Sequence, residues 1–334
     1  MGLWAGRTLT IADLSAYSKM RGRRFLPPSV RGLLIRHAYR DLLSRLKGGD
    51  IVWCHDQPYL SQALGRSIHL RGASLIYHSH DSLAPYATRS VYKSFSQPFA
   101  PDAFIFVSEA MRQEALNLFP GIKGTYAVHN GADEAVFYPR QPQSAPVNAV
   151  PIILYVGRLI PKKGIGVLMD AMRILQERHV EAACKVFGWP DVHGARLPAY
   201  VNWLVKTSPP NVTFEGFRSA KDIGDEYRRS DIFCCPSTWQ EPCGLVNIEA
   251  MACRIAVVAT HVGGIPEIAS GGGVLLVVPE SPVDLANALQ KVVLDKALRS
   301  RLADEGLSSY RRSFTWSLVN TQYQKINKGL GQGL

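Results

Sequence analysis

The sequence predicts an α/β protein built from two doubly wound domains, each with a parallel sheet covered by helices on both faces. Short apolar segments alternate with helix-length amphipathic segments along almost the whole chain, which is the pattern of strand–helix–strand units. Many of the apolar segments have no polar face, as strands of a buried parallel sheet require. Four prolines between residues 139 and 151 predict a linker, so a cleft between two domains is the expected ligand site.

The predicted strands are rich in Val, Ile and aromatic residues and are bounded by Gly, Pro or Asp. They are expected at 51–55, 74–78, 103–107, 126–129, 152–156, 184–187, 212–215, 232–235, 255–259 and 274–277. Helices are expected at 29–47, 57–71, 108–118, 164–178, 219–229, 244–252, 282–294 and 315–327. The predicted domains are an N-terminal domain over 1–140, a C-terminal domain over 151–313 and a final helical segment over 314–334.

Composition narrows the class of protein. The 334 residues are 46% hydrophobic and 19% charged, which is an ordinary globular balance. No apolar stretch approaches the roughly 18 residues that a membrane span needs, and no secretory signal is visible at the N-terminus. The six cysteines form no C-x-x-C pair. We therefore expect buried, reduced cysteines in a cytoplasmic protein.

The net charge is +11, and the densest run of basic residues lies at 19–47. This run could meet an anionic membrane surface, which would place the protein at the inner membrane face, or it could be a solvated helix face. Nucleic acid is disfavoured as a partner because Phe25 and Tyr39 are the only aromatic residues within the run.

A loop at 157–164, with the sequence G-R-L-I-P-K-K-G, joins a predicted strand to a predicted helix. Arg158 and Lys163 would lie at the carboxyl edge of the sheet, where open α/β sheets bind ligands. A planar guanidinium and an ammonium group together suit a diphosphate. The alternative is a solvated basic loop. The loop is not a P-loop because the required glycine–lysine spacing is missing.

A second segment, S-T-W-Q-E-P-C-G-L-V-N-I-E at 237–249, contains two carboxylates. Glu241 precedes a helix that starts near Gly244, and Glu249 lies more than one turn into that helix. Free amides at a helix start can hold a phosphate, and a carboxylate can accept hydrogen bonds from two vicinal hydroxyls. The pattern predicts a ligand with a sugar at each end of a pyrophosphate. Alternatively, Glu249 caps the helix or pairs with a surface arginine.

A third segment, T-H-V-G-G-I-P-E at 260–267, places two glycines after a strand, where they would allow a ligand to approach the backbone closely. Together with V-S-E at 107–109 and N-G-A-D at 130–133, these segments resemble family 4 retaining glycosyltransferases. The resemblance covers residues from about 100 to 334. It implies the GT-B fold, in which two Rossmann-like domains face a cleft.

The resemblance also implies roles by position. It assigns the donor pyrophosphate to the loop of Gly157, Arg158 and Lys163. It assigns the nucleotide ribose to Glu249 and the hydroxyls of the transferred sugar to Glu241.

The backbone amides of Gly244 and Leu245 would meet the distal phosphate. In the first domain, members of the family place a histidine against the donor sugar at the end of a strand. His80, followed by Asp81, fits this position best. His78 is the alternative, because it lies two positions earlier and on the same face if the strand continues. The implied catalytic residues are thus His80, Glu241, Arg158 and Lys163.

The first 50 residues depart from the family pattern. They lack a Gly-rich loop after an apolar strand, and only 9–11 suggests a strand. We therefore expect the first domain to lack its first β-α-β unit.

The implied activity is that of a metal-independent, retaining hexosyltransferase. It would move a hexose from a UDP- or GDP-linked donor to a hydroxyl of a glycan, a lipid-linked acceptor or a small molecule, without a cofactor. No D-x-D sequence occurs in the chain, so we expect no metal ligands at the pyrophosphate. The alternatives are a catalytically incomplete nucleotide-sugar-binding protein, suggested by the short N-terminus, and a nucleotide-sugar 2-epimerase.

Overall fold

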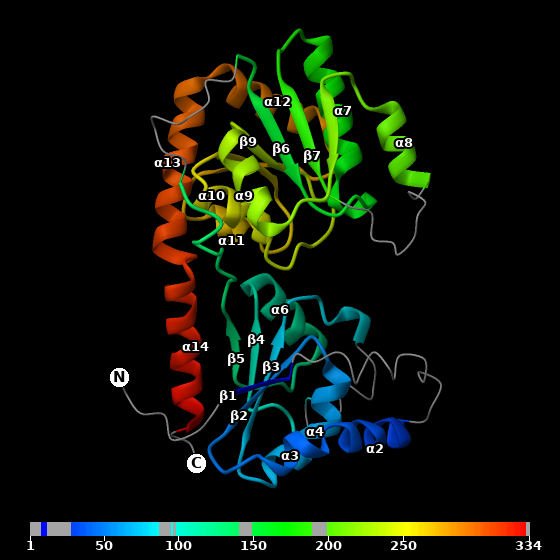
Figure 1. The fold of residues 1–334 in the computed structure, drawn as a ribbon, viewed down its shortest axis with the longest axis vertical. Helices are drawn as coiled ribbons and strands as arrows, with labels where there is room; N and C mark the ends of the chain where they lie inside the picture. Colours follow the sequence, from blue (N-terminus) through cyan, green and yellow to red (C-terminus); the bar gives the residue numbers. More distant parts are fainter. Residues whose placement is uncertain are drawn as a thin grey trace. The chain divides into compact units, whose positions relative to one another are not determined.

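The computed structural model in Figure 1 describes residues 8–11, 28–86, 95, 98–139, 149–188 and 199–331. Parts of two predicted features lie outside the described residues, namely 19–27 of the basic run and 140–148 of the linker. Contacts divide the chain into two units. The first unit comprises Met1–His129 with Asn320–Leu334, and the second comprises Asn130–Val319. Within the described ranges, no helix has the length and apolar character needed to cross a lipid bilayer.

The first unit is built on a parallel sheet whose strands lie in chain order, from β1 to β5. The strands are β1 (Thr8–Ile11), β2 (Ile51–His55), β3 (Ser74–Ser79), β4 (Ala103–Phe106) and β5 (Thr125–Ala127). The helices are α2 (Pro28–Ala38), α3 (Arg40–Ser44), α4 (Pro58–His69), η2 (Ala84–Tyr86) and α6 (Glu109–Leu118). Strands β3 and β4 are buried along their whole length, as expected of central strands between helical layers.

Two elements of the first unit, at 29–47 and at 9–11, differ from their predicted extents. The single helix predicted at 29–47 is in fact two helices, α2 and α3, which are separated by a turn at Tyr39. The weak strand signal at 9–11 corresponds to β1, which pairs in parallel with β2 from Thr8↔Ile51 to Ile11↔Cys54. The predicted absence of a β-α-β unit stays a prediction.

The second unit has a six-stranded parallel sheet in the order β11-β10-β9-β6-β7-β8. Its strands are β6 (Ile152–Val156), β7 (Ala183–Phe187), β8 (Val212–Gly216), β9 (Ile232–Cys235), β10 (Ala256–Thr260) and β11 (Val274–Val277). Its helices are η4 (Pro161–Lys163), α7 (Ile165–Glu177), α8 (Ala199–Thr207), α9 (Ala220–Arg229), α10 (Leu245–Ala252), α11 (Ile265–Ala269), α12 (Pro282–Leu294) and α13 (Lys296–Ser313). The strand order reverses between β6 and β9, which is the switch point where doubly wound sheets bind ligands.

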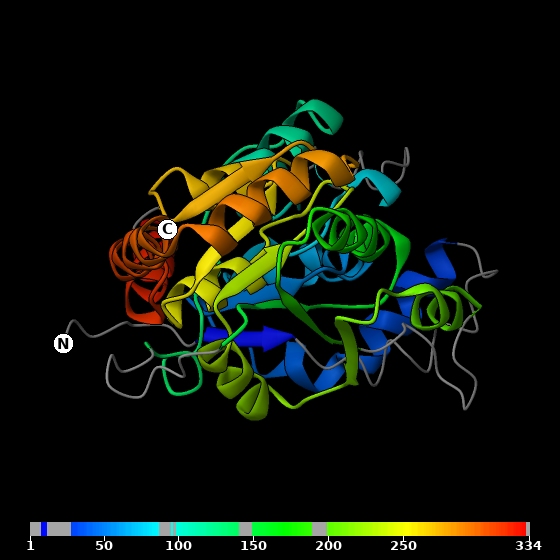
Figure 2. The same ribbon diagram turned by 90° about the horizontal axis from the view of Figure 1, so that it is seen from above.

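Helices cover both faces of this second sheet. Helices α7 and α12 lie side by side and share a core with alternate strand residues, such as Ile153, Cys234 and Val258 (Figures 1 and 2). The intervening residue Phe233 contacts the ring of Tyr227 in α9, so it points to the opposite face. This alternation explains why the strands read as continuous apolar runs.

The sequence patterns did not predict α8, α11 and α13. Helix α13 buries Leu302, Leu307 and Tyr310. The small residues Ala303, Gly306 and Ser309 share the same buried face and make its apolar stripe faint. Its start is fixed by the Asp295 carboxylate, which accepts a hydrogen bond from the Leu298 amide at 2.8 Å. The predicted terminal helix is α14 (Trp316–Gly331), whose residues from Asn320 onward group with the first unit.

The segment 130–139 belongs to the second unit, whereas the predicted domain boundary placed it in the first. Ala132 forms a parallel bridge with Thr315, and the Arg228 guanidinium donates a hydrogen bond to the Val136 carbonyl at 2.8 Å. These contacts tie the segment to α9 and to the start of α14. Sequence composition could not reveal these contacts. It placed the domain boundary at the proline-rich linker, which follows this segment in the chain.

Candidate active site

The loop after β6 carries the two predicted cations at the carboxyl edge of the second sheet. Its backbone is held by Tyr155, whose buried hydroxyl donates to the Arg158 carbonyl at 3.0 Å. Gly164 then starts α7 with φ +72°, and a Cβ there would overlap the carbonyl oxygen of Pro236. Only glycine fits this position, which brings the loop against the end of β9.

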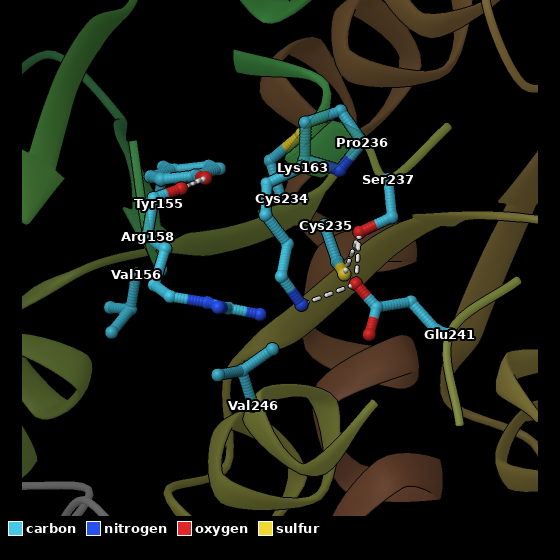
Figure 3. A pocket seen from close by; sticks show the side chains of 11 residues that line it. Tyr155, Val156, Arg158, Lys163, Cys234, Cys235, Pro236, Ser237, Glu241 and Val246 are labelled. Atoms are coloured by element: carbon cyan, nitrogen blue, oxygen red, sulfur yellow. Dashed lines mark hydrogen bonds and ion pairs between the residues drawn. The ribbon is translucent and has the colours of Figure 1, made fainter. Parts of the chain in front are cut away.

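Lys163 and Glu241 form the central contact of this edge (Figure 3). The Glu241 Oε1 atom lies 2.6 Å from Lys163 Nζ and also accepts hydrogen bonds from Ser237 Oγ at 2.6 Å and Trp239 Nε1 at 2.9 Å. The Glu241 side chain is only 6% exposed, so its charge depends on these donors. None of the three donors reaches its other oxygen, Oε2, which points away from Lys163 in Figure 3.

These side chains border a pocket of about 140 Å³ at the ends of β6 and β9. Predicted site residues that line it are Gly157, Arg158, Lys163 and Glu241. The pocket thus unites both predicted cations with the loop carboxylate (Figure 3). The remaining lining residues are Tyr155, Val156, Cys234, Cys235, Pro236, Ser237 and Val246.

Helix α10 begins beside this pocket. Gly244 is its N-cap with φ +77°, and Leu245 is its first residue and exposed, as the prediction of a phosphate-facing helix start requires. Neither residue lines the pocket itself. Their predicted role stays a prediction.

Glu249 has a different environment from Glu241. It is half-buried in α10 and accepts a hydrogen bond from the Tyr227 hydroxyl at 3.0 Å, so its described partner is a buried tyrosine and not a surface arginine. Burial raises the pKa of Glu249 to about 7, although the Tyr227 hydrogen bond acts in the opposite direction. The carboxyl group therefore titrates near neutral pH.

The two glycines of the third segment contact the protein itself. A Cβ on Gly263, which has φ +54°, would overlap the backbone of Glu241. The Gly264 amide donates to the Glu241 carbonyl at 2.8 Å. The two glycines thus let this segment approach the Glu241 loop and position its carboxylate. The predicted approach of a ligand stays a prediction.

The predicted histidines lie in the first unit. His80 follows β3 and is paired with Asp56, which follows β2. Asp56 Oδ2 lies 3.0 Å from His80 Nδ1, and the His80 amide donates to Oδ1 at 2.6 Å. Burial alone would raise the pKa of Asp56, but the hydrogen bonds from His80 lower it below its ordinary value. The carboxylate that contacts the His80 ring is therefore that of Asp56.

His78 is buried in β3, with 3% of its surface exposed. Burial, with the nearby His80 and His55 adding to it, lowers its pKa to about 2, so the ring is neutral. His55 ends β2 and lies opposite His78 in the sheet register. The sequence pattern pointed to His78 and His80, whereas only the pairing of β2 with β3 brings His55 beside them.

Comparisons with known proteins agree with this architecture. Over most of the chain, the fold matches crystal structures of Anabaena Alr3699/HepE in complex with UDP (TM-score 0.77, 22% identity, 96% of this chain and 92% of that chain). It also matches sucrose-phosphate synthase from Thermosynechococcus elongatus (TM-score 0.76, 21% identity, 92% and 81%). These likenesses define the class: two Rossmann-like units of the GT-B fold, as the sequence predicted.

The family follows from the sequence comparison. The family model "Glycosyl transferases group 1" matches residues 139–308, about half of the chain. The chain therefore belongs to this family. It is 30% identical over 253 residues to alpha-maltose-1-phosphate synthase of Mycolicibacterium smegmatis, covering 68% of this chain and 64% of that protein. It is 28% identical over 232 residues to spore coat protein SA of Bacillus subtilis, covering 64% and 62%. The chain thus spans less than two thirds of both relatives.

Proposed function

We propose that this chain is a retaining glycosyltransferase that moves a hexose from a UDP- or GDP-linked donor to a hydroxyl acceptor. The observation that carries the proposal is the pocket where Arg158, Lys163 and Glu241 converge at the strand ends of the second unit. Two cations and a carboxylate at a sheet switch point suit a charged diphosphate joined to a hydroxyl-rich sugar.

In the proposed reaction, the bond between the anomeric carbon and the diphosphate breaks, and its electron pair leaves with the phosphate oxygen. The acceptor oxygen bonds to the same face of that carbon, and its proton passes to the leaving oxygen. Arg158 and Lys163 stabilise the negative charge that develops on the diphosphate, with the start of α10 at Gly244 and Leu245. In this proposal, these groups supply the positive charge that a metal ion would otherwise supply at the pyrophosphate.

Retention without a covalent enzyme intermediate is supported by the state of Glu241. Three donors converge on its Oε1 atom, and such a carboxylate is a weak nucleophile. Its Oε2 atom is proposed to accept hydrogen bonds from sugar hydroxyls. Glu249 is proposed to hold the ribose, and His80 to face the donor sugar.

The acceptor is proposed to be a hydroxyl of a glycan, a lipid-linked sugar or a small molecule. Exposed Arg36 in α2 and Arg40 in α3 continue the basic run and supply charge for peripheral contact with an anionic inner membrane face.

The test is calorimetric titration of the purified chain with UDP, GDP and ADP, with and without EDTA. One nucleotide is expected to bind independently of EDTA. Because each charge-assisted contact contributes roughly 1.5–3 kcal/mol, the Arg158→Ala/Lys163→Ala variant should bind about 100-fold more weakly or worse. Lys206→Ala, an exposed lysine in α8, is the matched control. A folded wild-type chain that binds none of the nucleotides would refute the proposal.

Binding alone does not establish transfer. The second measurement is therefore release of UDP or GDP from the matching nucleotide sugar, with NMR of the product's anomeric proton. Retained configuration is expected. Tight donor binding without turnover would instead identify a nucleotide-sugar-binding protein, and isomerisation of the donor sugar would identify an epimerase.

A further inference from the structure

Three histidines gather at the carboxyl ends of two neighbouring strands in the first unit. His55 and His78 are opposite each other in the β2–β3 register, and His80 follows two residues later. Their ring centroids are 4.1 Å apart for His78 and His80, 5.1 Å for His55 and His78, and 5.5 Å for His55 and His80. One nitrogen from each ring lies within 4.8 Å of the other two.

The central ring lacks the hydrogen bonds that a buried imidazole normally makes. His78 is 3% exposed, and neither its Nδ1 nor its Nε2 atom has a hydrogen-bond partner within the described ranges. Buried polar atoms without partners are uncommon because each one costs free energy. The aromatic rings of Trp53 and Tyr323 pack edge-on against His78 and hold it in place, but they supply no acceptor of comparable strength.

The ring of His80 is oriented by a contact with the Asp56 carboxylate. Its Nδ1 atom faces Asp56 Oδ2 at 3.0 Å, which leaves Nε2 available on the opposite side of the ring. A carboxylate on the far nitrogen of a histidine is the usual outer contact of a metal-bound imidazole, since it fixes the tautomer and strengthens the ligand. Asp56 itself takes a left-handed backbone conformation, with φ +52°, at the end of β2.

We propose that His55, His78 and His80 form a binding site for a divalent transition-metal ion, with Zn²⁺ the best match, and that Asp56 is its positioning residue. Three imidazole nitrogens, with a solvent molecule as the fourth ligand, are a donor set that suits a tetrahedral Zn²⁺ ion. Bond lengths of about 2.0–2.1 Å require the outer nitrogens to move inward by roughly 1 Å. His55 and His80 are half-buried and can make this adjustment by side-chain rotation, whereas His78 is fixed.

The metal site shares one residue, His80, with the proposed donor-sugar site, so a bound metal ion would compete with the donor sugar for the His80 Nε2 atom. Metal binding itself does not require transfer activity. The metal site lies in the first unit, and the diphosphate pocket is built from residues of the second. A chain without any transfer activity would still bind the metal. Conversely, nucleotide binding that is unchanged by EDTA would not contradict the metal site. One of the two proposals can therefore be refuted while the other is supported.

The test uses the untagged full chain, stripped of metal with a chelator and titrated with Co²⁺. We expect one Co²⁺ ion per chain with the intense visible bands of tetrahedral coordination, and Zn²⁺ should abolish these bands by displacement. His55→Ala and His80→Ala should each lose them. Asp56→Asn should retain the site but weaken its affinity roughly 10- to 100-fold.

His69→Ala is the matched control, because His69 Nε2 also lies 3.0 Å from a carboxylate, that of Asp102, in the same unit. This variant should bind Co²⁺ like the wild type. Circular dichroism of each variant verifies that it is folded. The proposal is overturned if the folded wild type shows no tetrahedral bands, or if His69→Ala loses Co²⁺ binding as fully as His55→Ala and His80→Ala.

Discussion

The two units differ in whether the buried polar side chains at their strand ends have hydrogen-bond partners. In the second unit, the buried Glu241 carboxylate has three donors on a single oxygen, including the ammonium group of Lys163. In the first unit, the equally buried His78 has no described partner on either ring nitrogen. The first arrangement neutralises the Glu241 charge inside the protein. The second leaves the two ring nitrogens of His78 available to a metal ion.

This difference bears on what a ligand must do in each place. A diphosphate entering the second unit has to compete with Glu241 for Lys163, so part of the binding free energy is offset by the pair that it breaks. A metal ion entering the first unit satisfies atoms that are already unpartnered. Four substitutions test this difference between the two units.

The largest effect is expected for Lys163→Ala. It leaves the Glu241 carboxylate buried without a cation, and breaking a buried pair in this way costs about 3–5 kcal/mol of unfolding free energy. Adding Glu241→Gln should restore much of the loss, as measured by urea denaturation. Lys185→Ala, which removes a half-buried 3.7 Å pair with Glu226, should cost less than about 1 kcal/mol. Equal losses for the two lysine variants would remove the contrast.

The next largest effect is expected for Gly263→Ala. The added Cβ would overlap the Glu241 backbone, so we expect a loss of about 3 kcal/mol and weaker nucleotide binding. Gly216→Ala provides the comparison, because Gly216 has a similar positive φ of +74° but open space around its Cβ position. It should cost only about 1 kcal/mol, the price of a left-handed backbone. Thermal unfolding of both variants shows whether the loss of stability comes from the overlap with the Glu241 backbone or from the positive φ alone.

In the first unit, Asp56→Asn is expected to reduce the rise in Tm that Zn²⁺ produces in the wild type. A 10- to 100-fold weaker site corresponds to about 1.4–2.7 kcal/mol of lost stabilisation at saturating metal. Without metal, the effect of the substitution on Tm should be small, because both side chains of the Asp56–His80 pair are more than a third exposed. Equal Tm shifts by Zn²⁺ in both proteins would argue against a positioning role for Asp56.

An effect of similar size is expected for Glu249, and it depends on pH. Its pKa is raised from 4.5 to about 7 in the folded protein, so its contribution to stability is fully present below pH 4.5 and is lost as pH rises through 7. Glu249→Gln keeps an acceptor for Tyr227 and removes the charge. The variant should therefore gain about 2.5 kcal/mol relative to the wild type between pH 5 and pH 8. Chemical denaturation at both pH values measures this, and a pH-independent difference would contradict the raised pKa.

Much of the second unit could be predicted from sequence because its signals are local. Strands β6, β9 and β11 begin and end where the apolar runs do, and the loops carrying Arg158, Lys163 and Glu241 follow those strands directly. Parallel strands then bring their carboxyl ends to one edge, so these side chains had to lie near each other. Helix α13 escaped prediction because small residues share its buried face with Leu302, Leu307 and Tyr310 and weaken the apolar pattern.

The family, the two parallel sheets and the identity of the loop cations and carboxylates could all be inferred from local sequence patterns. Tertiary structure alone decided that Lys163 pairs with Glu241, that Gly263 supports the Glu241 loop, and that Asp56 holds His80. These contacts join residues 22 to 78 positions apart, across strands whose order and register no local pattern encodes. The physical reason is that periodicity reports which face of an element is buried, whereas the partner on that face is set by long-range packing.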